Sequence, residues 1–485
     1  MKPVILYSGL LVWVFIALVL TELGRRRMGE GIFSFVLADR RLSGFISAMT
    51  YSATTYSAFM MIGLVGLTYT AGVAALGFEM TYLIFTVLLL IVFAPRFWVA
   101  GQRFDHLTPP ELLKDRYSSS LVGATAAVIC LVMLIPYLSV QLMGSGYLFV
   151  ELTNGQVSYM TGVLIMAVFG AVVTLIAGMR AVSFTDAFQA ITMLITSIIL
   201  LFYIFYAFFG SPIGFFDVMS SNYSELLKVN WSFKKFVGLS LPWAFFAMTN
   251  PQVSQRMFVS RDVGSLKKMI LYFSIFGFIY TIITTLFGLS AAHIVPNIAQ
   301  PDKAMPILLT KVPDILALLV FLGIFAAATS TLGSIFLTLG SIASRDIVKT
   351  LDVEVSEKSE VNLARFVITL LLVFTIFFAR LRLDLIAVLS SMASAGLLVM
   401  APSIIGCFFW KRANSKAAFS SMVTGSILVS ALYFFNIYIG GWWPSVVGLL
   451  VTVIVFVTVS FLTGEKEDGG FIKEIEEGLI EYNFK

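Results

Sequence analysis

The sequence predicts an all-α polytopic membrane protein with about 13 transmembrane helices. Of its 485 residues, 59% are hydrophobic and 12% are charged, whereas ~25% of the residues in a typical soluble domain are charged. One soluble core cannot bury this much apolar surface, because the buried fraction of a large chain levels off with size. The apolar residues are instead grouped in runs close to the ~20 residues that cross a bilayer.

Reading these runs in order gives the expected spans. The first run ends in the basic triplet Arg25, Arg26 and Arg27. It is longer than the apolar core of a signal peptide and has no small-residue cleavage site, so we treat it as a helix. The expected spans are 3–24, 42–72, 74–100, 121–150, 157–178, 185–209, 236–256, 268–295, 313–345, 362–380, 384–410, 417–436 and 441–463.

The basic residues predict how the spans are oriented. If the N-terminus lies outside, 24 of the 32 Lys and Arg residues fall in inner segments and 8 in outer ones, which agrees with the positive-inside rule. We therefore expect a multi-pass protein of the cell membrane, with its N-terminus outside and its C-terminus cytoplasmic. Residues 1–464 form a single transmembrane domain, and the polar, acidic residues 465–485 form a cytoplasmic tail that is either amphipathic or disordered.

The composition excludes several classes of function. Two His and two Cys residues leave little for a metal cluster or a disulfide framework. No paired nucleophile and base is present, so we expect no enzyme. The chain has a net charge of +5, but its basic residues are distributed as membrane orientation predicts. No nucleic-acid motif interrupts the spans. The lipid bilayer is the partner that composition implies, and no obligate protein partner is evident.

Two of the expected spans are interrupted. The second carries the polar run 50–57 at its middle, followed by Gly63 and Gly66, and the seventh carries Pro251 within the polar segment 249–252. Backbone groups in lipid must be bonded internally, so a broken helix marks a cavity or a site. Interrupted helices at matching positions in two halves of a chain favour an inverted-repeat transporter. The alternative is that hydroxyl runs and prolines are tolerated kinks.

The ninth span contains a stretch of small and hydroxylated residues, 326–334 (AAATSTLGS). Small residues let membrane helices approach closely, so this stretch is explained by packing alone. Alternatively, the adjacent hydroxyls of Ser330 and Thr331 supply oxygens to a small cation, with carbonyls of an unwound neighbour completing the shell.

Six short motifs occur in a fixed order on these spans. They are FVLADRRLSG (35–44), LTPPELLKDRY (107–117), AGMRAVSFTDAFQ (177–189), NPQVSQR (250–256), residues 326–332, and Pro402 with FWKRAN (409–414). Together they resemble the sodium:solute symporter family, which includes sodium-coupled proline, pantothenate, monocarboxylate, sialic acid and glucose carriers. The resemblance covers about residues 35–425.

The resemblance implies a LeuT-type five-plus-five inverted repeat within a transporter domain, with one extra helix before it and two after it. Repeat one spans about 42–209 and repeat two about 236–410, and each begins with an interrupted span. The coupling ion is then Na⁺. The implied sodium ligands are the carbonyls of Ala53, Tyr56 and Ala327 and the hydroxyls of Ser330 and Thr331.

A second sodium site is implied less clearly. Asp186 and Ser334 match the second site of some family members, but Gly333 stands where a hydroxyl is expected. Asp186 has an alternative role as the structural partner of Arg180 at the cytoplasmic face.

The resemblance places the solute site between the broken helices and the fourth span. The candidate lining residues are Ser57, Glu79, Tyr137, Gln141, Trp243, Ala247 and Asn250. Ala247 replaces an aromatic residue of the proline carriers, which opens the pocket. Glu79 places a carboxylate well inside a span. An ionisable group at such a position is by default a candidate for function. It favours amines or hydroxyl-rich solutes. The alternative is that Glu79 lies near the outer surface, wetted or bonded to a hydroxyl.

The sequence therefore predicts a sodium-coupled symporter of a small organic solute that works by alternating access. A proton-coupled permease or ion-leaking channel of the same fold is one alternative. A membrane sensor that needs a partner protein is another.

Overall fold

The computed structural model describes residues 1–26, 32–176, 179–347, 356–464 and 470–484. Within these ranges the regular structure is helical, and the extended backbone is limited to an isolated bridge between Leu42 and Ser260. The predicted all-α class is confirmed. Nine of the described helices are long and apolar enough to cross a membrane, or ten if the bent pair α19 and α20 counts as one span. The number of 13 crossings therefore stays a prediction.

The first half of the chain supplies one long helix, one interrupted helix and four further long helices. In order, its elements are α1 (Pro3–Arg25), α2 (Ile32–Leu37), η1 (Ala38–Arg40), α3 (Gly44–Thr55), η2 (Phe59–Leu64), α4 (Val65–Ala71), α5 (Val73–Phe104), α6 (Pro109–Arg116), α7 (Ser120–Leu152), α8 (Tyr159–Ile176), α9 (Met179–Phe209), α10 (Pro212–Asn222) and η3 (Ser224–Leu227).

The second half begins with another interrupted helix. Its elements are α11 (Phe233–Ala244), α12 (Phe246–Thr249), α13 (Pro251–Ser254), η4 (Gln255–Phe258), α14 (Val263–Ile294), η5 (Pro301–Lys303), α15 (Ala304–Leu309), α16 (Asp314–Ser341), η6 (Ile342–Ile347), α18 (Glu357–Leu381), α19 (Ile386–Leu398), α20 (Ala401–Phe409), α21 (Ser415–Phe434), η7 (Ile439–Gly441), α22 (Pro444–Leu462) and α23 (Gly470–Glu481).

Side-chain caps define where several of these helices begin. Ser43 accepts a hydrogen bond from the amide of Ile46 at the start of α3, and Asp262 accepts from the amide of Ser265 at the start of α14. Such caps satisfy amides that have no partner within the helix. Polar residues between the apolar runs therefore determine where these helices begin.

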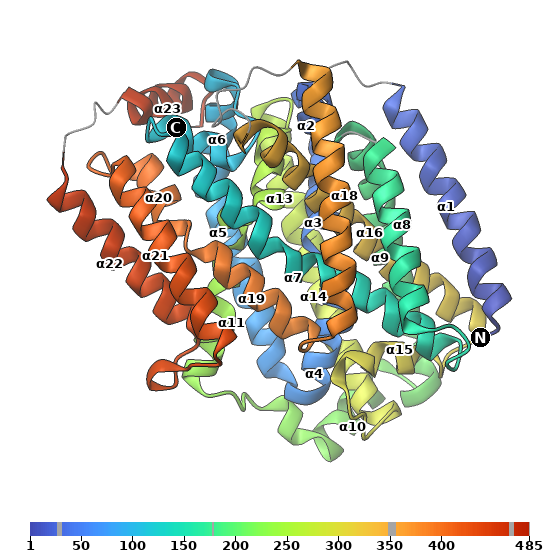
Figure 1. The fold of residues 1–485 in the computed structure, drawn as a ribbon. Helices are drawn as coiled ribbons and strands as arrows, with labels where there is room; N and C mark the ends of the chain where they lie inside the picture. Colours follow the sequence, from blue (N-terminus) through green and yellow to red (C-terminus); the bar gives the residue numbers. More distant parts are fainter. Residues whose placement is uncertain (27–31, 177–178, 348–355, 465–469, 485) are drawn as a thin grey trace.

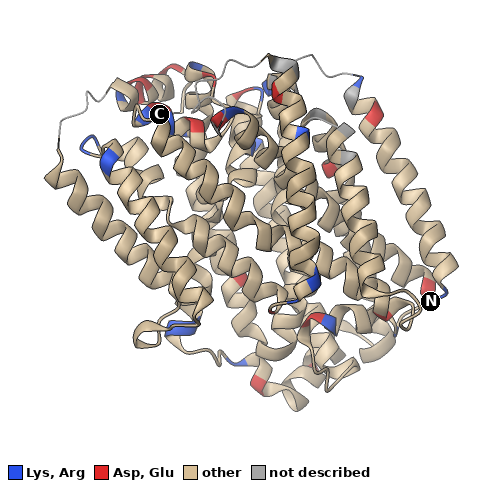
Figure 2. Ribbon diagram, viewed as in Figure 1, with Lys and Arg blue, Asp and Glu red and all other residues tan. Residues whose placement is uncertain are grey.

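The helices form a bundle with two charged faces. Lys, Arg, Asp and Glu gather at the two ends of the bundle, with few between them (Figure 2). The chain begins at one face and ends at the opposite face (Figure 1). The arrangement of apolar helices between charged faces is that of a multi-pass membrane protein.

The two interrupted helices lie inside the bundle. The first half of the first interrupted helix, α3, packs against α9, α14 and α16, whereas α11, the first part of the second, packs against α5, α19 and α22. The bridge from Leu42 to Ser260 links the start of α3 to the segment after η4. Both interruptions are therefore surrounded by other helices, as broken helices in lipid require.

The C-terminal segment is partly helical. Helix α23 packs on α5 through buried Ile475 and Leu479, and Glu481 accepts a hydrogen bond from Arg103 at 2.7 Å. Within the predicted tail, residues 470–481 form this helix with one face buried, and 465–469 lie outside the described residues.

Candidate functional site

The first interrupted helix ends beside α16. Thr55 is the last residue of α3, and Tyr56 leaves the helical conformation with φ −91° and ψ 90°. The chain becomes helical again as the π-helix η2 from Phe59. The last carbonyls of an α-helix have no amide partner within it. Those of Ala53 and Thr54 therefore need donors from another element.

Two buried hydroxyls of α16 supply these donors. Ser330 Oγ donates to the Ala53 carbonyl oxygen at 2.8 Å and lies 3.0 Å from the Ala327 carbonyl oxygen. Thr331 Oγ1 lies 3.1 Å from the Ala53 carbonyl oxygen and 3.3 Å from that of Thr54. Neutral oxygens from two helices thus converge in the interior, a donor set typical of Na⁺ sites in transporters with unwound helices.

These contacts join four of the five predicted sodium ligands. The fifth, Tyr56, lies at the break itself, but the contacts described for this cluster do not include its carbonyl. Its ring stacks on Phe273 at a centroid distance of 5.8 Å. A Cβ at Gly277 would lie 2.2 Å from the Tyr56 hydroxyl. The side chain therefore anchors the break against α14, which requires glycine at 277.

The two residues predicted for a second sodium site lie near one another, with Arg256 beside them. Thr50 Oγ1 donates to Asp186 Oδ2 at 2.5 Å, and Arg256 Nη2 donates to Ser334 Oγ at 2.6 Å. The same Nη2 lies 4.0 Å from Asp186 Oδ2. Asp186 thus pairs with Arg256, and the side chain of Arg180, its predicted alternative partner, lies outside the described residues.

The second interruption is built around Pro251. Asn250 has an extended ψ of 110°, and Pro251 then begins α13. Because proline has no amide hydrogen, the Ala247 carbonyl lacks its usual helical donor. Among the described residues, Asn250 Nδ2 and both polar side-chain atoms of Gln252 have no hydrogen-bond partner, although they are buried. This break presents side-chain amides to the interior.

Helix α7 holds the first interruption through three of the predicted solute residues. Ser57 Oγ lies 3.3 Å from Tyr137 Oη, and Gln141 Oε1 accepts the Ala58 amide at 3.1 Å. The non-helical segment after α3 is thus tied to the fourth expected span, and the solute site at this place stays a prediction.

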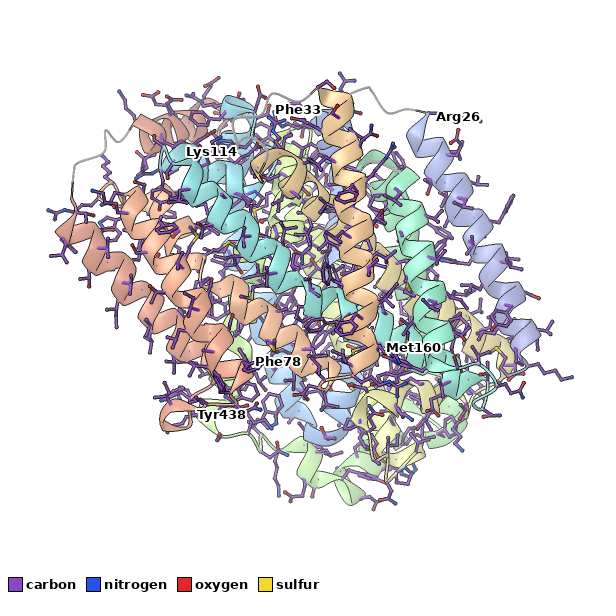
Figure 3. The ribbon with its side chains drawn as sticks, in the orientation of Figure 1. Arg26, Phe33, Phe78, Lys114, Met160 and Tyr438 are labelled. Carbon is purple, nitrogen blue, oxygen red and sulfur yellow. The ribbon has the colours of Figure 1, made fainter. Side chains whose placement is uncertain are left out.

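An aromatic cluster surrounds Trp243. Its ring stacks on Phe59 at 4.9 Å and on Phe246 at 5.1 Å, and Tyr82 lies edge-on at 5.5 Å. Figure 3 shows Phe78, another ring of this cluster, inside the bundle. Sequence reasoning named only Trp243 and Tyr137 among the cluster. The signal that it missed is spacing, because residues 78 and 82, like 243 and 246, share a helix face.

Glu79 lies beside this cluster in sequence and is 1% exposed. Within the described part of the chain, neither carboxylate oxygen has a hydrogen-bond partner. This burial does not fit a position near the outer surface, and the role of Glu79 in solute binding stays a prediction. Leaving a buried carboxylate without donors is costly, which strengthens the functional hypothesis.

The second half of the first interrupted helix, α4, is covered by η5. A Cβ at Gly66 of α4 would lie 2.6 Å from the Pro301 carbonyl oxygen, so glycine permits this contact. Next to it, Asp302 Oδ2 accepts the Ile386 amide at 2.9 Å. Burial raises the pKa of Asp302 to about 7, with a further increase from Asp384, although the Ile386 amide acts in the opposite direction.

The profile of the sodium:solute symporter family matches residues 35–425. The sodium/pantothenate symporter of Escherichia coli is 27% identical over 454 residues, which cover 89% of this chain and 91% of that protein. The sodium/myo-inositol cotransporter 2 of Bos taurus is 28% identical over 424 residues, covering 76% and 60%.

Two solved structures share the fold. A Na⁺-coupled sialic acid symporter in a substrate-bound outward-open state has a TM-score of 0.81 and 18% identity, covering 96% of this chain and 99% of that one. A nucleobase-cation-symport-1 family transporter in a closed conformation has a TM-score of 0.61 and 13% identity, covering 91% and 98%. These likenesses confirm the LeuT-type fold.

Proposed function

Because this chain belongs to the sodium:solute symporter family, we propose that its sodium ion binds between α3 and α16 and that its solute binds between the two interrupted helices. The chain is a transporter and not an enzyme, and it couples sodium to a small solute by alternating access. The proposal concerns which residues perform each part of that activity.

The observation that carries the sodium assignment is the contact of two α16 hydroxyls with the end of α3. Ser330 and Thr331 both reach the Ala53 carbonyl oxygen. Hydroxyl hydrogens rotate freely, so the two oxygens turn their lone pairs to Na⁺ when it binds. The carbonyls of Ala53, Tyr56 and Ala327 complete the ligand set.

Sodium at this position joins α3 to α16 and thereby favours the conformations in which the two helices are close. An ion shifts a conformational equilibrium only by its difference in affinity between the states. Solute binding at the neighbouring break uses the same element, since Ser57 follows Tyr56 directly. The two ligands therefore stabilise each other's site, and the low internal sodium concentration empties the site on the inner side.

The proposed solute site contains Ser57, Glu79, Tyr137, Gln141, Trp243, Ala247 and Asn250. Aromatic rings supply apolar area, and Glu79 accepts hydrogen bonds from hydroxyl or amine groups. A buried carboxylate also repels anions. We therefore propose a neutral polyol or an amine-bearing solute. The relatives transport pantothenate, proline and myo-inositol by name. Of these three solutes, pantothenate alone has a net negative charge, because the carboxylate of proline is balanced by its amine, so we rank pantothenate last.

The proposed orientation has the N-terminus outside and the C-terminus, with α23, in the cytoplasm. Its support is the excess of basic residues on the inner segments, together with the location of the two chain ends on opposite faces (Figure 1). Repeat one, about 42–209, and repeat two, about 236–410, then cross the membrane in opposite senses.

Uptake into liposomes tests this proposal. Purified protein is reconstituted and loaded with potassium, and a panel of myo-inositol, proline, lactate, glucose and pantothenate is offered in sodium or in choline buffer. Uptake of one neutral or amine-bearing solute that needs sodium is the expected result. Uptake that is driven by a pH gradient in sodium-free buffer would contradict it and favour the proton-coupled alternative.

A further inference from the structure

We propose that Arg256 fills the position of a second sodium ion, as a cation tethered to the protein, so that each transport cycle uses one sodium ion. This inference rests on the proposed function of the first sodium site. It concerns the cluster of Asp186, Ser334 and Arg256, which lies deeper along α16 than Ser330 and Thr331.

The guanidinium of Arg256 already contacts the oxygens that a second ion would need. Arg256 is 0% exposed. Its Nη2 donates to Ser334 Oγ at 2.6 Å and lies 4.0 Å from Asp186 Oδ2. The hydroxyl that the sequence pattern leads one to expect at residue 333 is absent, because this residue is glycine, and a Cβ there would lie 3.1 Å from Thr174 Oγ1 of α8. Ser334 Oγ is therefore bonded to a cation from the chain itself, and the same cation forms the ion pair with Asp186 Oδ2, whereas Asp186 Oδ1 has no hydrogen-bond partner among the described residues.

The charge balance favours one cation at this position. Asp186 is buried, carries one negative charge when ionised and forms its ion pair with Arg256. Arginine stays protonated in proteins. A sodium ion added here would leave a net positive charge in a low-dielectric interior, where uncompensated charge is strongly unfavourable. The ion pair thus leaves no electrostatic gain for a second ion.

The tethered cation is connected to the first sodium site through Thr54. Thr54 Oγ1 lies 2.9 Å from Ser334 Oγ, and the Thr54 carbonyl oxygen accepts from Thr331 Oγ1. Arg256 belongs to η4, directly after the second interruption. Its charge therefore ties that segment to α9 through Asp186 and to α16 through Ser334, without drawing on the sodium gradient.

Equilibrium binding of ²²Na⁺ to purified protein tests the inference without knowledge of the solute, with choline chloride holding the ionic strength constant. The wild-type chain is expected to bind one sodium ion. Arg256→Gln exposes the Asp186 carboxylate and adds an amide oxygen, so this variant is expected to bind two. Arg256→Lys, which retains the cation, and the double variant Asp186→Asn/Arg256→Gln, which removes both charges, are expected to bind one.

Two sodium ions bound to the wild-type chain would overturn the inference and leave the first site intact. No sodium bound to the wild-type chain would instead contradict the proposed function, so the two failures are distinguishable. A folded Arg256→Gln protein that still binds one ion also overturns the inference. If Arg256→Gln does not fold, the test depends on the number of sodium ions bound by the wild-type chain and by Arg256→Lys. The inference requires one bound ion in each, and two in either would overturn it.

Discussion

The two interrupted helices solve the same problem in different ways. In the first, α3 ends without a proline, and its free carbonyls at Ala53 and Thr54 are taken up by hydroxyls of α16. In the second, Pro251 removes an amide, and among the described residues Asn250 Nδ2 and both polar side-chain atoms of Gln252 have no hydrogen-bond partner.

The difference indicates a division of labour. Backbone carbonyls and hydroxyls offer fixed, neutral oxygens, which suit a small ion. Side-chain amides offer both donors and acceptors, which suit an organic solute beside the aromatic cluster at Trp243. We therefore propose that the first break, whose carbonyls contact the α16 hydroxyls, faces the ion, and that the second break, at Pro251, faces the solute.

The strongest test removes the ion side alone. Replacing both hydroxyls, Ser330→Ala with Thr331→Ala, deletes two contacts worth about 1.5–3 kcal/mol each when the partner is charged. The sodium concentration for half-maximal uptake is expected to rise by at least ~100-fold, measured in proteoliposomes. Thr329→Ala is the matched control, because Thr329 Oγ1 instead accepts from Gln189 Nε2. Unchanged sodium dependence in the double variant would sink the ion assignment.

Closing the second break tests the solute side. Pro251→Ala restores an amide that can bond the Ala247 carbonyl, so the helix is expected to continue through Asn250. Maximal uptake should fall by about 10-fold or more, whereas sodium binding measured by thermal shift should persist. Pro242→Ala, in the body of α11, is the control. Full uptake by Pro251→Ala would show that the proline break is dispensable.

A third change separates solute from ion at the carboxylate. Glu79→Gln keeps the shape of the side chain and removes its charge. Loss of a charged hydrogen bond of about 1.5 kcal/mol raises the solute KM by about 10-fold, and the sodium requirement should stay within twofold. Glu225→Gln, at an exposed ion pair, is the control. An altered sodium requirement with an unchanged KM would assign Glu79 to the ion side instead.

The smallest expected effect is the pH dependence of stability that comes from Asp302 of η5, next to the first interrupted helix. The pKa of Asp302 is raised to about 7, above the ordinary value of about 3.9, so folding favours the protonated carboxyl. Its contribution to stability is complete below about pH 4 and is lost as the pH rises to about 7. The melting temperature should fall by a few degrees across this window, and Asp302→Asn should flatten the slope. An equal slope in the variant would exclude this group.

The sequence located both breaks because hydroxyl runs and proline act locally on a helix. It also placed Ser330 and Thr331 correctly on one helix, although their contact with Ala53 is tertiary. Arg256 was counted with the inner basic residues, since it stands at the expected end of a span. Its complete burial depends on Asp186 and Ser334, which come from two other helices. A contact between residues so far apart in the sequence cannot be predicted from a local pattern.

The aromatic cluster illustrates the same limit. Phe59, Phe78 and Phe246 are indistinguishable in sequence from the many phenylalanines that face lipid. Their convergence on Trp243 arises only when α5, η2 and α12 are packed together. The sequence shows that Glu79 is an acidic residue inside an expected span. That its carboxylate meets no hydrogen-bond donor among the described residues depends on the packing of the helices and could not be predicted.

The docking of α23 on α5 affects how this protein is best labelled. Trp98 of α5 meets Tyr482 edge-on at 5.0 Å, and Gly478 sits against Val99. A fluorescent or affinity handle that replaces residues 470–484 would uncover this apolar strip on the same helix that carries Glu79. A handle on the exposed segment 436–441, which joins α21 to α22, leaves that contact in place and reports on the opposite end of the bundle.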